Sequence, residues 1–127
     1  MKLFCIASGS SGNCVYAGSE KHAVLVDAGV TAKRIEQALC SADCLPVSAV
    51  LLTHEHIDHV RGLEVFLKHN PVPVFATAGT LAAIAGTLEK CGLKHLLHPI
   101  DPGVCFSIGD LNIMPVSTCH DAADPVF

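Results

Sequence analysis

The sequence lacks an apolar run long enough to cross a membrane, because Gly, Pro, Asp or His interrupts every run well before the roughly 20 residues that a transmembrane helix needs. Its first residues, MKLFCI, form too short an apolar stretch for a secretory signal. Internal repeats, low-complexity tracts and shifts in composition that would mark a linker are also missing. These absences favour a soluble cytoplasmic protein with one domain.

Cysteine pairs at the C-x-x-C spacing are absent, although the chain has 7 cysteines. The number is odd, and the cysteines fall within expected strands and helices, so the pattern indicates neither a disulfide framework nor a zinc knuckle. We interpret them as buried free thiols, with metal ligation as the less favoured alternative.

An excess of positive charge is missing too. The chain has 8 Lys and Arg against 12 Asp and Glu, and its net charge of −4 argues against a large nucleic-acid surface on this chain alone. What the sequence does have is apolar material. Because 50% of the 127 residues are hydrophobic, one domain can bury a core.

Strands and helices alternate in the hydrophobic pattern. Apolar and β-branched runs predict strands over residues 2–7, 14–17, 22–27, 48–53, 72–76, 104–108 and 111–117. Helical spacing and caps predict helices over 32–40 after Thr31, over 60–69, and from Thr77 or Thr80 to Cys91-Gly92. This order indicates an α/β fold, in which active sites gather at the carboxyl ends of strands. Asp27, His54 and His120 fall at such ends.

The segment HEHIDH, residues 54–59, directly follows a predicted strand and holds three histidines and two carboxylates in six positions. On a loop that leaves a strand, the imidazoles of His54 and His56 can converge on one ion, whereas on a helix they would point to different sides. Asp58 and His59 can turn toward a second, neighbouring ion. The pattern favours two metal ions over one, and metal binding over a group of satisfied polar residues.

His120 offers a third imidazole from another strand end. Three histidines around one ion, with a position left for water, are typical of a catalytic rather than a structural site. The zinc-protease motif H-E-x-x-H is excluded, because it needs a histidine where the chain has Asp58. The remaining histidines lack such context and are interpreted as surface or satisfied residues: His22, His69, His95 and His98.

A glycine-rich loop separates the first two predicted strands, with the sequence Ser8-Gly9-Ser10-Ser11-Gly12-Asn13. Its glycines would permit close approach of backbone N–H groups to a phosphate. A tight turn between two strands is the alternative, and the residue chemistry alone favours that turn. The loop is not a P-loop, because no G-K-[ST] follows it.

Together these motifs resemble the metallo-β-lactamase fold, through H-x-H-x-D-H at 54–59, the earlier strand-end Asp27 and the later His120. The loop at 8–13, V-D-A-G at 26–29 and H-D-A-x-x-P-V at 120–126 narrow the resemblance to the YycJ/WalJ-like bacterial exonucleases. The resemblance spans essentially the whole chain. It implies an α/β fold that is the first half of an αββα sandwich, with a mixed sheet and helices on one face.

The resemblance also implies the roles of the site residues. His54, His56 and His120 would hold one divalent ion, and Asp58 and His59 would begin a second site and be catalytic. Asp27 would orient a ligand through a hydrogen bond. The implied reaction is phosphodiester hydrolysis by a two-metal centre, with DNA attacked from its 5′ ends. Zinc and manganese both suit such a ligand set.

Two alternatives remain open from the residues alone. Other hydrolases of the same fold act on thioesters or lactams with the same six-residue motif, and a non-catalytic metal-binding or association module is also compatible with 127 residues. Family members contain a second α/β half that supplies further metal ligands. Here the only carboxylates after His120 are Asp121 and Asp124. We therefore expect residues 1–127 to be an N-terminal half, with an uncovered sheet face that self-associates or requires the missing half.

Overall fold

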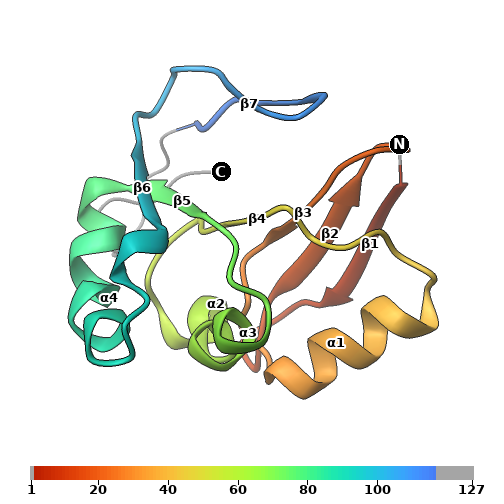
Figure 1. Ribbon diagram of the computed structural model, residues 1–127, viewed down its shortest axis with the longest axis horizontal. Coiled ribbons are helices and arrows are strands. Elements are labelled where there is room, and N and C mark those ends of the chain that lie inside the picture. Colours follow the sequence, from red (N-terminus) through yellow and green to blue (C-terminus); the bar gives the residue numbers. More distant parts are fainter. Residues whose placement is uncertain (1, 117–127) are drawn as a thin grey trace.

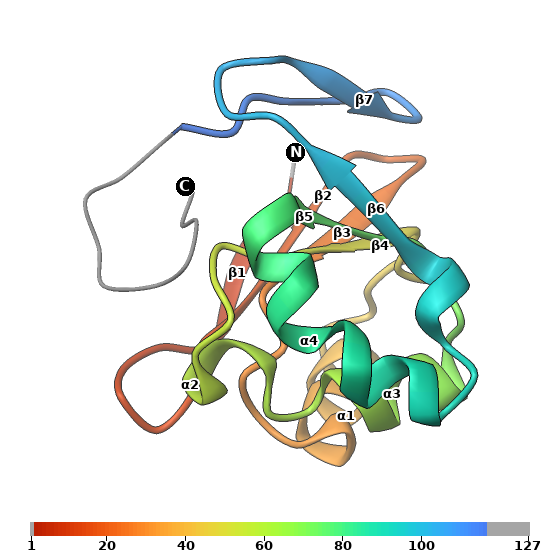
Figure 2. The same ribbon diagram turned by 90° about the vertical axis from the view of Figure 1, so that its left-hand side faces the viewer.

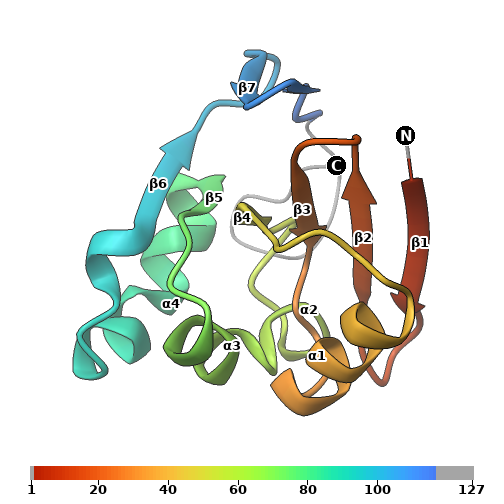
Figure 3. The ribbon, with the colours of Figure 1, turned by 45° about the vertical axis from the view of Figure 1, so that its right-hand side comes forward.

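A six-stranded mixed sheet organises the computed structural model, which describes residues 2–116 (Figure 1). Its strands are β1 (Lys2–Ala7), β2 (Cys14–Gly18), β3 (Ala23–Val26), β4 (Ala49–Leu51), β5 (Val74–Thr77) and β6 (Leu97–Ile100). They lie side by side in chain order, with β1 and β6 at opposite edges (Figure 3). The first three strands pair antiparallel and the pairs from β3 to β6 are parallel.

The helices of the described residues cover one face of this sheet (Figure 2). They are α1 (Ala32–Ser41), α2 (Ile57–Val60), α3 (Leu63–His69), α4 (Ala78–Lys90) and the 3₁₀ turn η1 (Lys94–Leu96). Each parallel connection steps in the same direction along the sheet, and because such crossovers are right-handed, their helices are carried to the same side. Within residues 2–116 no helix has the length and apolar character needed to cross a bilayer.

The core lies between the sheet and these helices. Inward side chains of strands β2 and β3 meet those of α1 and α3, and the largest are almost completely buried: Tyr16, Leu25, Ile35, Phe66 and Leu67. Thr31 begins α1 as expected, with its hydroxyl accepting the Arg34 N–H at 3.3 Å. Burial of this one face therefore accounts for most of the stability that apolar contacts supply.

The opposite face carries a hairpin of β7 (Phe106–Ile108) and β8 (Leu111–Ile113) (Figure 2). Only a small buried cluster forms beneath it in the described chain, made by Val24, Ala49 and Leu111. The hairpin turn is tied to the loop between β2 and β3, because the Ser19 hydroxyl donates to Asp110 at 2.7 Å and the His22 ring lies 3.0 Å from the same oxygen. The sheet face that we expected to be uncovered is thus partly covered by residues of the chain itself.

The structure confirms the mixed α/β sheet with helices on one face, but it corrects two local predictions. The helix predicted over 60–69 ends at His69 as expected but begins only at Leu63, since α2 and α3 are separate and break at Gly62. A Cβ there would lie 1.9 Å from the Val30 carbonyl oxygen, and the Gly62 N–H donates to Ala28 at 2.8 Å. The sequence pattern indicated neither η1 nor β6, because β6 contains Pro99 and exposed side chains, which an edge strand tolerates.

Among the described cysteines, the interpretation as buried thiols is correct for Cys14 and wrong for three that are exposed, Cys5, Cys40 and Cys105. Cys44 and Cys91 are half-buried, and all six are free thiols. The predictions on His120, Asp121 and Asp124 lie outside the residues that the structure describes.

Candidate metal centre

The HEHIDH segment follows β4 at the carboxyl ends of the parallel strands. His54, Glu55 and His56 lie in the loop between β4 and α2, and Asp58 and His59 lie in α2. The loop conformation allows the imidazoles to gather: the His54 ring centroid is 3.7 Å from that of His59 and 4.9 Å from that of His56. Three nitrogen-donor side chains therefore meet at one end of the sheet.

Asp27 holds one of these rings in place. It lies directly after β3 with a φ of 65° and is almost completely buried. Its Oδ2 accepts a hydrogen bond from Nδ1 of His59 at 2.6 Å, and its Oδ1 accepts from the Thr53 N–H at 2.8 Å. Because a carboxylate only accepts, the proton of a neutral His59 ring is on Nδ1, which leaves the lone pair on Nε2 for a ligand.

Thr53 extends the same arrangement to His54. Its hydroxyl donates to Asp27 Oδ2 at 2.8 Å, and its oxygen lies 3.0 Å from Nδ1 of His54. Since the only hydroxyl proton goes to Asp27, the oxygen can accept from His54, whose Nε2 then carries the lone pair. Both rings thus present the nitrogen that a metal ion would use. Thr53 was not among the site residues predicted from the sequence, although its position directly before His54 was a usable signal.

The surroundings of His59 favour its protonated form. Burial disfavours the imidazolium, but the hydrogen bond to Asp27 and the charges of Asp27 and Asp58 outweigh it and raise the pKa of His59. Such a ring is a strong electron donor, because the carboxylate behind it increases its basicity.

The spacing of two donor atoms fits a single ion. Oδ2 of Asp58 lies 3.5 Å from Nε2 of His59. Ligand atoms at about 2.0–2.2 Å from a tetrahedral zinc ion stand about 3.4 Å apart. Across residues 2–116, however, no group of three or more His, Cys, Asp or Glu side chains is arranged to hold a metal ion. The described chain therefore supplies a donor pair and neighbouring imidazoles rather than a closed site.

The backbone around these residues is locked by close approach. A Cβ on Gly29 would lie 1.8 Å from the carbonyl oxygen of Asp58, so only glycine fits in V-D-A-G. The Asn13 N–H donates to that same oxygen at 2.7 Å, and the Ala28 N–H donates to His59 at 2.8 Å. The loop at 8–13 thus turns between β1 and β2 and contacts the HEHIDH segment, and its binding of phosphate stays a prediction.

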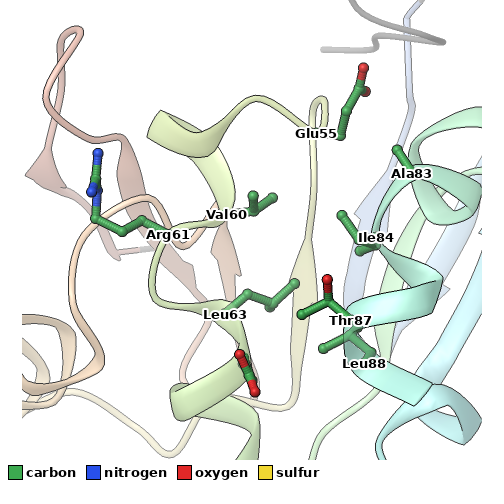
Figure 4. Close-up of a pocket in the computed structure, with 9 residues that line it drawn as sticks. Glu55, Val60, Arg61, Leu63, Ala83, Ile84, Thr87 and Leu88 are labelled. Atoms are coloured by element: carbon green, nitrogen blue, oxygen red, sulfur yellow. The ribbon is translucent and has the colours of Figure 1, made fainter. Parts of the chain in front are cut away.

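A half-open pocket of about 270 Å³ lies beside this segment, between α2–α3 and α4 (Figure 4). Ile84 and Leu88 of α4 face Val60 and Leu63, and Glu55 lies at one end of the pocket. The lining therefore combines apolar side chains with a carboxylate from the metal-binding motif.

The sequence pattern of the metallo-beta-lactamase superfamily matches residues 7–125, and the chain belongs to this superfamily. Within it, the chain is YycJ/WalJ-like. It is 36% identical over 132 residues to Exodeoxyribonuclease YycJ of Bacillus anthracis, covering 96% of this chain and 47% of that protein. It is 34% identical over 130 residues to Exodeoxyribonuclease WalJ of Streptococcus pneumoniae, covering 99% of this chain and 48% of that one.

Of two further matches, one covers less of this chain and the other has a lower sequence identity. Hydroxyacylglutathione hydrolase of Yersinia enterocolitica is 40% identical over 81 residues, which cover 63% of this chain and 31% of that protein. The crystal structure of MEM-A1, a subclass B3 metallo-beta-lactamase from a soil metagenome library, superposes with a TM-score of 0.77 at 18% sequence identity. The match covers 98% of this chain and 52% of the MEM-A1 chain, which shows that the two share a fold. The chain spans about half the length of the curated relatives it matches.

Proposed function

We propose that this chain carries the N-terminal half of a metal-dependent nuclease centre that hydrolyses phosphodiester bonds of DNA in the cytoplasm. The observation that carries the proposal is the donor pair of Asp58 and His59, fixed by Asp27 at the carboxyl end of the sheet. The two exodeoxyribonucleases match nearly the whole chain, whereas the thioester hydrolase matches 63% of it. DNA is therefore the favoured substrate over a thioester.

In this proposal the residues hold two divalent ions, with zinc or manganese as the candidates. His54 and His56 hold one ion together with His120, and Asp58 and His59 begin the site of the other. When bound, such ions lower the pKa of a bound water and neutralise charge on the phosphate oxygens. Asp58 would also position the attacking water.

The other side chains prepare this site before any ion binds. Asp27 accepts a hydrogen bond from the Nδ1–H of His59 and so leaves the Nε2 lone pair for an ion. Thr53 holds the Asp27 carboxylate through both its N–H and its hydroxyl. These contacts fix the His59 ring before an ion binds, so less side-chain freedom is lost on metal binding.

Metal titration of the 127-residue chain after dialysis against a chelator tests the proposal. We expect the wild-type chain to bind Zn²⁺ or Mn²⁺, and we expect His54→Ala and Asp58→Ala to lose affinity by at least about tenfold. His95→Ala, an exposed histidine outside the motif, is the matched control. Equal affinities for all four proteins would contradict a centre at HEHIDH.

Substrate class needs a separate assay. Chain that has bound metal is incubated with 5′-labelled duplex DNA and, in parallel, with a glutathione thioester. Release of labelled nucleotides supports the nuclease proposal. Hydrolysis of the thioester without cleavage of DNA would contradict it and favour a thioester hydrolase.

Self-association belongs to the same proposal. Apolar side chains remain exposed on and beside the hairpin-covered face, with Leu3 70%, Met114 50% and Val116 54% exposed. We propose that a second copy, or a further half of the protein, covers them. A monodisperse monomer in light scattering would argue against pairing of two copies.

A further inference from the structure

The side chain of Asn13 has a defined orientation in the loop between β1 and β2. Its Oδ1 accepts from the Gly9 N–H at 3.1 Å, and its Nδ2 donates to the Gly9 carbonyl oxygen at 2.9 Å. Only the amide oxygen can accept and only the amide nitrogen can donate, so this pair of bonds settles which atom is which. The second hydrogen of Nδ2 is directed away from Gly9.

That second hydrogen meets the donor pair of the metal centre. Nδ2 of Asn13 lies 3.2 Å from Oδ2 of Asp58 and 3.4 Å from Nε2 of His59, which are themselves 3.5 Å apart. It also lies 3.2 Å from the Asp58 carbonyl oxygen. One N–H group therefore faces two electron-rich atoms that would bind the same cation.

The backbone fixes the position of this amide. The Asn13 N–H donates to the Asp58 carbonyl at 2.7 Å, and the Asn13 carbonyl accepts from the Gly29 N–H at 2.8 Å. Gly29 also packs against Asp58 with no room for a Cβ, so the backbones of these segments are in direct contact. The amide thus stays beside Asp58 and His59 whenever the loop is folded.

We propose that Asn13 is a positioning residue of the metal centre: before an ion binds, its amide holds the Asp58 carboxylate beside the His59 Nε2, and when an ion binds, the amide stays on Asp58 while the Nε2 lone pair passes to the ion. The inference rests on the proposed function and goes beyond it, since it assigns the loop's asparagine a role in metal binding. A carboxylate oxygen and a ring lone pair repel each other at 3.5 Å, and an N–H donor between them offsets that repulsion. Without the amide, the two side chains would separate and bind an ion less tightly.

Cobalt titration of the 127-residue chain provides the first test, because the visible absorption of Co²⁺ reports its binding without any activity assay. We expect Asn13→Ala to weaken Co²⁺ binding by about tenfold or more, as removal of groups that orient metal ligands does. The matched control is Asn70→Ala, which removes an asparagine amide bonded to the Phe66 carbonyl at 3.2 Å in another part of the fold. The affinity of this control should stay within about twofold of wild type.

A second variant covers the case in which Asn13→Ala does not fold. Asn13→Ser keeps a polar group in the loop, but its side chain ends short of the position of Nδ2, so we expect a similar loss of affinity. Wild-type affinity in a folded Asn13 variant would overturn the proposal and reduce Asn13 to a turn residue.

A double-mutant cycle tests the contact without metal. Urea unfolding in the presence of chelator is compared for wild type, Asn13→Ala, Asp58→Ala and the double variant. We expect the shift of the double variant to be smaller than the sum of the single shifts, because the shared contact is lost only once. Additive shifts would overturn the proposal. If wild type binds no Co²⁺, the proposed function fails, and the cycle still decides whether Asn13 holds Asp58.

Discussion

The two faces of the sheet differ in how they are covered. The helical face buries a continuous core that includes Tyr16, Ile35 and Phe66. On the other face, only Val24, Ala49 and Leu111 form a buried cluster among the described residues. Phe106 of the hairpin reaches Phe75 of the sheet, with ring centroids 5.3 Å apart. The hairpin face is thus a thin layer fastened at a few points.

Most of the buried core and the candidate metal centre therefore belong to different parts of one sheet. The helical layer holds the strands in register, and the candidate metal centre lies where those strands end. The hairpin residues make none of the contacts that fix Asp27 and His59, whose hydrogen bond joins the end of β3 to α2. Three measurements test whether the two faces differ in stability.

The largest expected effect is in the reactivity of two thiols, one from each side. Burial, helped by the charges of Asp27 and Cys5, raises the pKa of the Cys14 thiol to about 12, whereas Cys105 beside the hairpin is exposed. Because the thiolate is the reactive form and Cys14 is accessible only after unfolding, we expect alkylation at pH 8 to be at least about a thousandfold slower at Cys14. Mass spectrometry of the digested protein measures both rates.

Comparable rates at the two cysteines would mean that the helical face opens as readily as the hairpin. Reaction of both in urea is the control, because the unfolded chain removes the difference in access.

The next effect is on the free energy of unfolding. Phe66 is fully buried under the helical layer, and we expect Phe66→Ala to lower that free energy by about 3–5 kcal/mol. Phe106→Ala removes the same number of atoms from the half-buried hairpin, and we expect a loss of less than about 2 kcal/mol. Urea unfolding of both variants gives the comparison. Equal losses would show that the two faces contribute alike.

The smallest effect concerns the fastening of the hairpin turn. Hydrogen bonds from the Ser19 hydroxyl and the His22 ring lower the pKa of Asp110. Because the pKa of Asp110 is lower in the folded protein, this contact stabilises the hairpin fully at pH values above the ordinary pKa of an aspartate. The stabilisation is lost as the pH falls through the lowered pKa. We expect hydrogen exchange in β7 and β8, corrected for its intrinsic pH dependence, to accelerate in acid while α3 stays protected.

His22→Ala should produce the same local acceleration at neutral pH and leave the unfolding midpoint unchanged. Acceleration spread evenly over both faces would indicate that Asp110 supports the whole fold rather than the hairpin.

Much of the fold could be predicted from the sequence, because most helices and strands have a local sequence signal. Thr31 caps α1, and the apolar runs mark the strands through β5. The break at Gly62 could not be predicted, since its cause is the approach of Ala28 and Val30, which are distant in sequence. The edge strand β6 carries exposed residues and a proline, so it has no strand-like pattern.

The candidate site divides in the same way. HEHIDH and Asp27 were recognisable from residue type and position at strand ends. The contacts of Asn13 with Asp58, 45 residues away, depend on how two loops pack, and no local pattern encodes that. Residue chemistry identifies the donors, whereas the groups that orient them become visible only in three dimensions.

The order of the strands along the sheet equals their order along the chain. Each strand of the sheet therefore finds its partner already synthesised as it leaves the ribosome, and no earlier strand has to wait for a distant one. At about 5–20 residues per second, the strands can pair one after another within seconds. The bond from Ser19 to Asp110 spans 91 residues and closes late. Such a chain can fold in the direction of its synthesis, with the hairpin docking after the six strands have paired.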